Sequence, residues 1–181
     1  YYKEDAGKLL LGAFETKAIP WPPEGGKIPD DFSFDELPGD LDHFQPILEQ
    51  AVKRVPILER LGMKTFFCGP ESFTPDDRYM IGETSETKNL FVATGLNSIG
   101  IGSSGGIGKV VSEWIVEGYP PMDLWDVNIL RMLPFQSNIK FLKERVTESL
   151  GLSYQIHWPY KQYETARNVR VSSIHNELKK Y

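Results

Sequence analysis

Glycine is concentrated in one short stretch, in which Gly95 and Gly108 enclose a run of small residues containing six glycines. Gly100, Gly102 and Gly105 in this run match the G-x-G-x-x-G spacing of dinucleotide-binding turns. Such a turn brings backbone N–H groups at a helix N-terminus close to a ligand, and the helix dipole favours electron-rich atoms there. Glycine also has no Cβ to keep a ligand away. The run therefore predicts a ligand-facing loop.

The residues after this run do not complete a dinucleotide-binding unit. A full motif needs a second strand that ends in an acidic residue about 20 positions later. Here the chain passes through Gly118, Pro120 and Pro121 to Asp123 and Asp126, with no apolar strand between. Two interpretations stay open, a ligand-facing loop and a bend that only packs a helix against a strand. Six glycines exceed the needs of a simple bend, which favours the ligand.

Regular elements are predicted on both sides of the glycine run. Residues 89–94 (NLFVAT) are nearly continuously apolar, typical of a strand covered on both faces in a mostly parallel sheet. The apolar residues after the run repeat at helical spacing and are Ile107, Val110, Val111, Trp114 and Ile115. Gly118 is placed to end that helix.

The rest of the chain indicates a mixed α/β protein, with α+β character. We expect strands at residues 8–14, 64–68 and 79–82, and helices at residues 41–55 and 137–150. Asp40 or Asp42 is placed to cap the first helix, with Pro46 near its permitted first turn, and Gly151 is placed to end the second. Residues 19–38 and 69–77 are rich in proline, glycine or aspartate and predict irregular structure, whereas residues 158–181 are typical of an extended wrap or linker.

The composition is that of a globular protein, with 40% hydrophobic and 25% charged residues. The net charge of −5 and the scattered basic residues argue against nucleic-acid binding. No apolar run reaches the roughly 18 residues that a membrane helix needs. The single cysteine, Cys68, excludes an internal disulfide, fits a reducing compartment, and is expected to be a small buried residue in a strand.

Few other side chains suggest chemistry, and no catalytic residue can be assigned. The three histidines, His43, His157 and His175, lack metal-binding spacing, so we predict no metal site and expect each at the surface or in a linker. Lys109 could face a ligand from the helix, although a solvated lysine is the more common case. Because the chain opens at Tyr1 without Met, we expect a piece of a longer protein.

Several long strings in the chain resemble one family. They are GPESFTPDDRYMIGE at residues 69–83, NLFVATGLNSIGIGSSGGIGKVVSEWIVEGYPPMDLWDV at residues 89–127, KFLKERVTESLGL at residues 140–152 and HWPYKQYETARNVR at residues 157–170. They resemble FAD-dependent oxidoreductases of the sarcosine and dimethylglycine dehydrogenase type, in the D-amino-acid-oxidase-like superfamily.

The resemblance implies the C-terminal portion of a two-domain fold that pairs an FAD-binding domain with a substrate-binding domain. Residues 1–88 would belong to the substrate-binding sheet domain, with one helix. Residues 89–120 would supply the last strand, glycine loop and helix of the FAD-binding domain, and residues 121–181 would lead to an aminomethyltransferase-like domain. The loop facing the isoalloxazine ring would comprise Asn97, Ser98, Ile99, Gly100, Ile101, Gly102 and Ser103.

The activity that the resemblance implies is hydride transfer from an N-methyl group of a small N-methylated glycine-type amine to FAD. The one-carbon unit would be hydrolysed or pass to tetrahydrofolate in a missing C-terminal domain. The motif that binds the ADP part of FAD would lie upstream of Tyr1, so this chain alone is expected to be inactive. The enzyme would be cytoplasmic in a bacterium, or in the mitochondrial matrix of a eukaryote.

Two alternatives are weighed against that enzyme. The same strings resemble the regulatory subunit of pyruvate dehydrogenase phosphatase, a non-catalytic relative. A self-standing binding or scaffold domain would instead fold alone, which we do not expect, because the strand at residues 89–94 would lack both neighbours. Similar amine oxidases often place an arginine before the turn at residues 69–77 to anchor a substrate carboxylate. Gly69 stands there, and the branch that this chain most resembles also lacks the arginine, so Arg78 is a candidate only by proximity.

Overall fold

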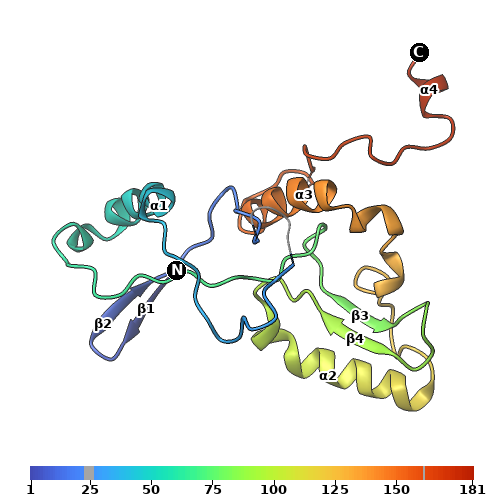
Figure 1. The fold of residues 1–181 in the computed structure, drawn as a ribbon, viewed down its shortest axis with the longest axis horizontal. Coiled ribbons are helices and arrows are strands. Elements are labelled where there is room, and N and C mark those ends of the chain that lie inside the picture. Colours follow the sequence, from blue (N-terminus) through green and yellow to red (C-terminus); the bar gives the residue numbers. More distant parts are fainter. Residues whose placement is uncertain (23–26, 161) are drawn as a thin grey trace.

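The computed structural model describes residues 1–22, 27–160 and 162–181. One part of the molecule holds a hairpin of β1 (Tyr2–Asp5) and β2 (Lys8–Leu11) beside helix α1 (Leu41–Arg54). The other part holds strands β3 (Met80–Glu83) and β4 (Phe91–Thr94), helix α2 (Gly100–Glu117) and helix α3 (Ile139–Leu152). Extended segments join the two parts (Figure 1). The mixed α/β character expected from the sequence is confirmed.

Helix α1 begins where the sequence predicted. Asp40 caps it by accepting the backbone N–H of His43 at 2.9 Å. Pro46 is the sixth residue of the helix and so lies just past the first turn, near which we expected it. It leaves one carbonyl of the preceding turn without its helical partner. The helix ends at Arg54, and a short 3-10 turn (Pro56–Glu59) follows.

The strand expected at residues 64–68 does not form. Its contact with another segment is a single bridge in which the N–H of Leu37 donates to the carbonyl of Cys68 at 2.8 Å. Pro38 follows Leu37 and has no N–H, so this pairing cannot extend along the chain. The expected burial of Cys68 is also wrong, because this residue is exposed.

Strands β3 and β4 pair antiparallel, with Met80 opposite Thr94 and Glu83 opposite Phe91. The mostly parallel sheet covered on both faces is therefore wrong for this chain, as is the expectation that residues 89–94 lack both neighbours. Beside β3, Ile81 donates its N–H to the carbonyl of Val127 at 2.9 Å and forms a parallel bridge with Asn128. Within the described residues, the other edge of β4 is unpaired.

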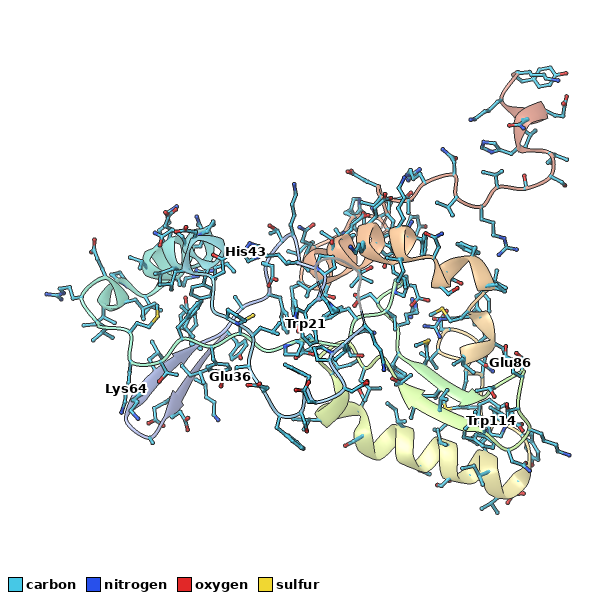
Figure 2. All side chains as sticks on the ribbon, viewed as in Figure 1. Trp21, Glu36, His43, Lys64, Glu86 and Trp114 are labelled. Atoms are coloured by element: carbon cyan, nitrogen blue, oxygen red, sulfur yellow. The ribbon has the colours of Figure 1, made fainter. Side chains whose placement is uncertain are left out.

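Helix α2 packs one stripe on this small sheet. Ile107 and Trp114 are buried, and the Trp114 ring meets that of Phe91 edge-on at a centroid distance of 5.8 Å. Figure 2 shows Trp114 reaching from α2 toward the strands. The helix stops at Gly118, which adopts a left-handed conformation, as predicted. Ile115 departs from the expected stripe, because it is exposed.

Asn138 caps helix α3, because its side chain accepts the N–H groups of Lys140 and Phe141 at 3.0 and 3.2 Å. Gly151 lies inside this helix and does not end it, contrary to expectation. Its Cα faces the carbonyl of Thr16, so a side chain has no room there. Two 3-10 turns, η2 (Ile129–Arg131) and η3 (Pro134–Ser137), precede α3.

The C-terminal residues follow the body of the molecule and then leave it, ending at the short helix α4 (His175–Leu178) (Figure 1). The start of this tail is docked on α3, since the N–H of Thr165 donates to the Glu148 carboxylate at 2.8 Å. An extended linker is therefore an incomplete description of the tail. Within the described residues, none of the helices is long and apolar enough to cross a membrane.

The molecule exposes far more surface than a compact monomer of its mass. Its accessible area is 13744 Å² for 20.6 kDa, against roughly 8,900 Å² from the size scaling of folded monomers. The buried apolar side chains are correspondingly few and are Ala18, Ala51, Ile81, Ile107, Trp114, Phe141 and Leu150. Much of the apolar surface is therefore left uncovered by this chain.

Candidate functional site

The ligand loop, defined here as residues 95–99, joins β4 to α2. Gly95, Asn97 and Ser98 all have positive φ, at 63°, 48° and 63°. A left-handed conformation costs a residue other than glycine about 1–2 kcal/mol. Two such residues in succession need neighbouring interactions that hold them in place.

Asn97 supplies those interactions by joining the ligand loop to the Thr74 turn, defined here as residues 74–78. The Asn97 side-chain carbonyl accepts the N–H of Thr74 at 2.8 Å, and the Asn97 N–H donates to the carbonyl of Ser72 at 3.0 Å. Asn97 Nδ2 and Thr74 Oγ1 lie 3.3 Å apart. Thr74 is 3% exposed and Asn97 8%. Water therefore cannot readily replace these bonds.

The two segments also approach closely at Gly95. A Cβ at that position would lie 2.5 Å from Cγ2 of Thr74, closer than side-chain carbons can pack. At the surface, the Ser98 hydroxyl donates to Glu71 Oε1 at 3.1 Å. The ligand loop is thus held by Glu71, Ser72 and Thr74.

The first turn of α2 carries the rest of the predicted site. Helix formation begins at Gly100, so Gly100, Ile101, Gly102 and Ser103 are helical, and the prediction of a loop is wrong for these four residues. Ile99 is the N-cap and makes no side-chain hydrogen bond to the first turn. The first N–H groups of a helix have no partner within it.

These N–H groups lie at an end of α2 that has an apolar, open surface. Ile101 is 97% exposed, and Ile99 is exposed as well. A Cβ added at Gly102 or Gly105 would meet nothing within 4 Å among the described residues. A backbone donor set beside open apolar surface suits a flat, largely apolar ligand that has hydrogen-bond acceptors along one edge.

Arg131, the last residue of η2, forms hydrogen bonds to the Thr74 turn. Nε and Nη2 of Arg131 donate to the two carboxylate oxygens of Asp76 at 2.7 and 3.0 Å, a bidentate pair. Nη2 also donates to the carbonyl of Arg78 at 2.7 Å, and Nη1 to that of Asn128 at 3.2 Å. The Arg131 side chain is 12% exposed. A fork of this kind fixes orientation as well as distance.

Helix α3 and its C-cap residue Ser153 hold the same turn at two further points. The fully buried hydroxyl of Ser149 lies 3.0 Å from the carbonyl of Pro75, within donating distance. The Ser153 hydroxyl lies 2.8 Å from both carboxylate oxygens of Asp77. Residues 74–78 are therefore held by the ligand loop on one side and by residues 131–153 on the other.

The remaining candidates do not join this site. Arg78 pairs with Asp126 at 3.2 Å in a half-exposed ion pair, in keeping with a solvated turn residue. Lys109 is exposed and lies 3.8 Å from Glu113. Among the described residues, no three His, Cys, Asp or Glu side chains gather closely enough to hold a metal ion.

The histidines are dispersed over separate elements. His43 Nε2 lies 3.6 Å from Glu15 Oε1, His157 Nε2 lies 2.9 Å from the carbonyl of Leu152, and His175 begins α4. Figure 2 shows His43 on α1, far from Trp114 of α2.

Partial burial of the thiol raises the pKa of Cys68, and the negative charge of Glu15 raises it further. A higher pKa leaves less of the reactive thiolate at neutral pH.

Several residues that shape the site gave little or no sequence signal. Thr74 and Asp76 belong to a turn that their residue types predict, but turn chemistry does not say what the turn contacts. Arg131 lies 55 residues from its partner Asp76, and nothing local connects them. Ser149 occupies the buried face of α3, where a serine in a helical pattern is usually assigned to the surface.

Two family models match the chain. One, described as FAD dependent oxidoreductase, matches residues 1–114, and the other, FAD dependent oxidoreductase central domain, matches residues 117–172. Three relatives are 4-methylaminobutanoate oxidase (formaldehyde-forming) of Paenarthrobacter nicotinovorans at 45% identity, the mitochondrial pyruvate dehydrogenase phosphatase regulatory subunit of Mus musculus at 35%, and mitochondrial sarcosine dehydrogenase of Mus musculus at 34%.

Each of these three alignments covers 98% of this chain but only 21%, 20% and 19% of the respective relative. The chain thus spans about a fifth of the length of the relatives that it matches. The first family model covers well over half of the chain, from the N-terminal hairpin to Trp114. The chain belongs to the family of FAD dependent oxidoreductases.

Proposed function

We propose that this chain supplies the isoalloxazine-facing part of an FAD site, in an enzyme that oxidises small N-methylated amines. The observation that carries the proposal is the start of α2, where backbone N–H groups without a side-chain cap adjoin a loop fixed by Asn97. The names of two relatives support the substrate class, since one is a 4-methylaminobutanoate oxidase and another a sarcosine dehydrogenase.

The residues present fit a flavin ring. Its pyrimidine edge offers hydrogen-bond acceptors, which the first N–H groups of α2 can meet, and its flat face suits the exposed side chain of Ile101. Bound FAD would supply the redox chemistry by accepting a hydride from the substrate. The N–H groups and the dipole of α2 would favour the negative charge that accumulates on that edge during reduction.

The site proposed here is partial. The unpaired edge of β4 and the outer face of α2 leave a strand and a helix uncovered among the described residues. Further polypeptide of the longer protein would cover both and bind the ADP part of FAD. This proposal agrees with the large exposed area and with the fifth of each relative that the chain spans. Isolated, the chain would be inactive.

The partners follow from the same proposal. The substrate would be a small amine, and its one-carbon unit would be hydrolysed or passed to tetrahydrofolate in a C-terminal domain. The domain boundaries after residues 88 and 120 stay predictions. A carboxylate anchor is not assigned, because the Arg78 side chain is paired with Asp126.

The second candidate function is regulatory binding without catalysis. One observation favours it: a relative at 35% identity is a pyruvate dehydrogenase phosphatase regulatory subunit. The ligand loop does not separate the two functions, because the geometry that would hold FAD for catalysis would also hold it as a structural ligand.

The test uses the full-length protein that contains this chain. We expect a yellow protein with flavin absorbance, bleached under anaerobic conditions by sarcosine, dimethylglycine or 4-methylaminobutanoate. The variant Ile101→Glu should lower flavin occupancy, because it places negative charge against the apolar face of the ring, whereas Ile101→Val should not.

The comparison is informative because a carboxylate in the first turn of a helix stabilises the helix. Loss of flavin from Ile101→Glu would therefore report on the site and not on unfolding. A colourless wild-type protein would refute the enzyme proposal. A yellow protein that no N-methylated amine reduces would support the regulatory function instead.

A further inference from the structure

Arg131 and Asn97 act on the same short turn although they lie in different parts of the chain. Asn97 belongs to the segment matched by the FAD dependent oxidoreductase model, and Arg131 to the segment matched by the central-domain model. The Thr74 turn lies between them. Its first residue bonds to Asn97, and its third and fifth residues, Asp76 and Arg78, bond to Arg131.

The bonds form a continuous path through the turn. Arg131 Nη2 donates to the carbonyl of Arg78 at 2.7 Å, and the same carbonyl accepts the Thr74 hydroxyl at 2.8 Å. That hydroxyl oxygen accepts the N–H of Arg78 at 3.0 Å and lies 3.3 Å from Nδ2 of Asn97. One carbonyl and one hydroxyl thus separate Arg131 from Asn97. Bonds linked in this way polarise and orient one another.

The geometry at Arg131 is that of a side chain with a defined position. It makes four hydrogen bonds, two of them to one carboxylate, and it is largely buried. A solvated arginine on a surface would have neither feature. Ser149 of α3 and Ser153 at its C-cap hold Pro75 and Asp77 from the same side. Residues 75–78 are therefore each bonded to the segment that the central-domain model matches.

We infer that Arg131 is a positioning residue for the ligand loop. It fixes the Thr74 turn, and the turn holds Asn97 in the left-handed conformation that precedes the first turn of α2. Residues 117–172, which the central-domain model matches, would then set the geometry of the flavin contact. That last step rests on the function proposed above, whereas the coupling between Arg131 and the loop does not.

The experiment compares Arg131→Lys and Asp76→Asn with wild type in the full-length protein. Lysine keeps the positive charge of Arg131 but cannot form the fork, and asparagine removes the charge of the partner. Amide hydrogen exchange of residues 95–103 is measured by mass spectrometry. We expect severalfold faster exchange in both variants, with exchange of residues 107–117 unchanged.

The control is Arg78→Lys, because the Arg78 side chain pairs with Asp126 at the surface while its backbone carbonyl stays in place. This control should exchange like wild type. The inference would be overturned if residues 95–103 exchanged at the same rate in wild type and in a folded Arg131→Lys or Asp76→Asn variant. So would faster exchange spread evenly over the protein, because it would report general destabilisation.

A second readout separates this inference from the proposed function. If the wild-type protein holds flavin, the reduction potential and visible circular dichroism of the flavin should shift in Arg131→Lys and not in Arg78→Lys. If the wild-type protein holds no flavin, the proposed function fails, and the exchange of residues 95–103 still decides the coupling. If both the flavin signals and the exchange of residues 95–103 stay unchanged in Arg131→Lys, the coupling is refuted and the proposed function is not.

Discussion

The side-chain carbonyl of Asn97 accepts the backbone N–H of Thr74 at 2.8 Å across 23 positions of sequence. This bond joins the ligand loop to a turn that Arg131 of η2 and Ser149 of α3 also hold. Asparagine suits the position for two reasons. It tolerates a left-handed backbone better than most residues, and its amide can both accept and donate. The local conformation of the site thus depends on a long-range contact.

Replacing Asn97 by alanine should destabilise the protein. The N–H of Thr74 would lose its acceptor in a buried setting, which costs about 1–3 kcal/mol. The denaturant midpoint of the full-length protein measures this change. Ser98→Ala is the matched control, because it removes a hydrogen bond from the adjacent left-handed residue at the surface. Its effect should stay within about 0.5 kcal/mol. Equal effects of the two substitutions would contradict a structural role for the buried bond.

Gly82 should not tolerate alanine. Its φ of 112° is one that residues with a side chain rarely adopt, and a Cβ would lie 2.6 Å from the Trp114 ring. Strain and overpacking together should cost about 2 kcal/mol or more. Thermal unfolding followed by tryptophan fluorescence measures the loss. Gly62→Ala serves as the control, because nothing lies within 4 Å of a Cβ there. A Gly82→Ala protein as stable as the control would show that α2 sits farther from β3 than described.

Elements set by local pattern could be predicted from the sequence. The stripe containing Ile107 and Trp114 gave α2 because a helix repeats its contacts every turn, and Gly118 marked its end through its own backbone preference. Asp40 marked the start of α1 for the same kind of reason. Such signals lie within a few residues of the element that they specify.

Pairing between distant segments could not be predicted in this way. The apolar run at residues 89–94 indicated a strand but not its partner, and β3 turned out to lie antiparallel beside it. The glycine run indicated a ligand contact but not its conformation, which depends on the bonds that Thr74 makes to Asn97. Arg131 gave no signal at all, because its role exists only once residues 76 and 131 meet in the fold.

Glu148 should make the docking of the tail on α3 depend on pH. Partial burial raises the pKa of its carboxyl. Hydrogen bonds from the Thr165 hydroxyl and from the N–H groups of Glu164 and Thr165, together with the charge of Arg145, outweigh that effect, so the pKa lies below its usual value. Arg145 also donates to the carbonyl of Thr165 at 2.7 Å and stacks on Tyr163 at 4.4 Å.

The direction of the pH effect follows from the lowered pKa. The folded protein holds the Glu148 proton more weakly than the unfolded chain, so the stabilisation is complete above the unfolded pKa of about 4.3. It is lost as the pH falls through the lower folded pKa. Glu148→Gln should speed amide exchange of residues 163–168 at neutral pH, because an amide group offers fewer acceptors to the two N–H groups and the hydroxyl. Wild type and variant should converge as the pH falls through the lowered pKa of Glu148.

Glu144→Gln is the control for this prediction, since Glu144 is exposed on the same helix. It should leave exchange of residues 163–168 unchanged at every pH. Exchange is compared after correction for the intrinsic pH dependence of the chemical step, so that only opening of the docked segment remains. A difference between wild type and Glu148→Gln that grew as the pH fell would contradict the prediction, because a carboxylate with a lowered pKa contributes least when it is protonated.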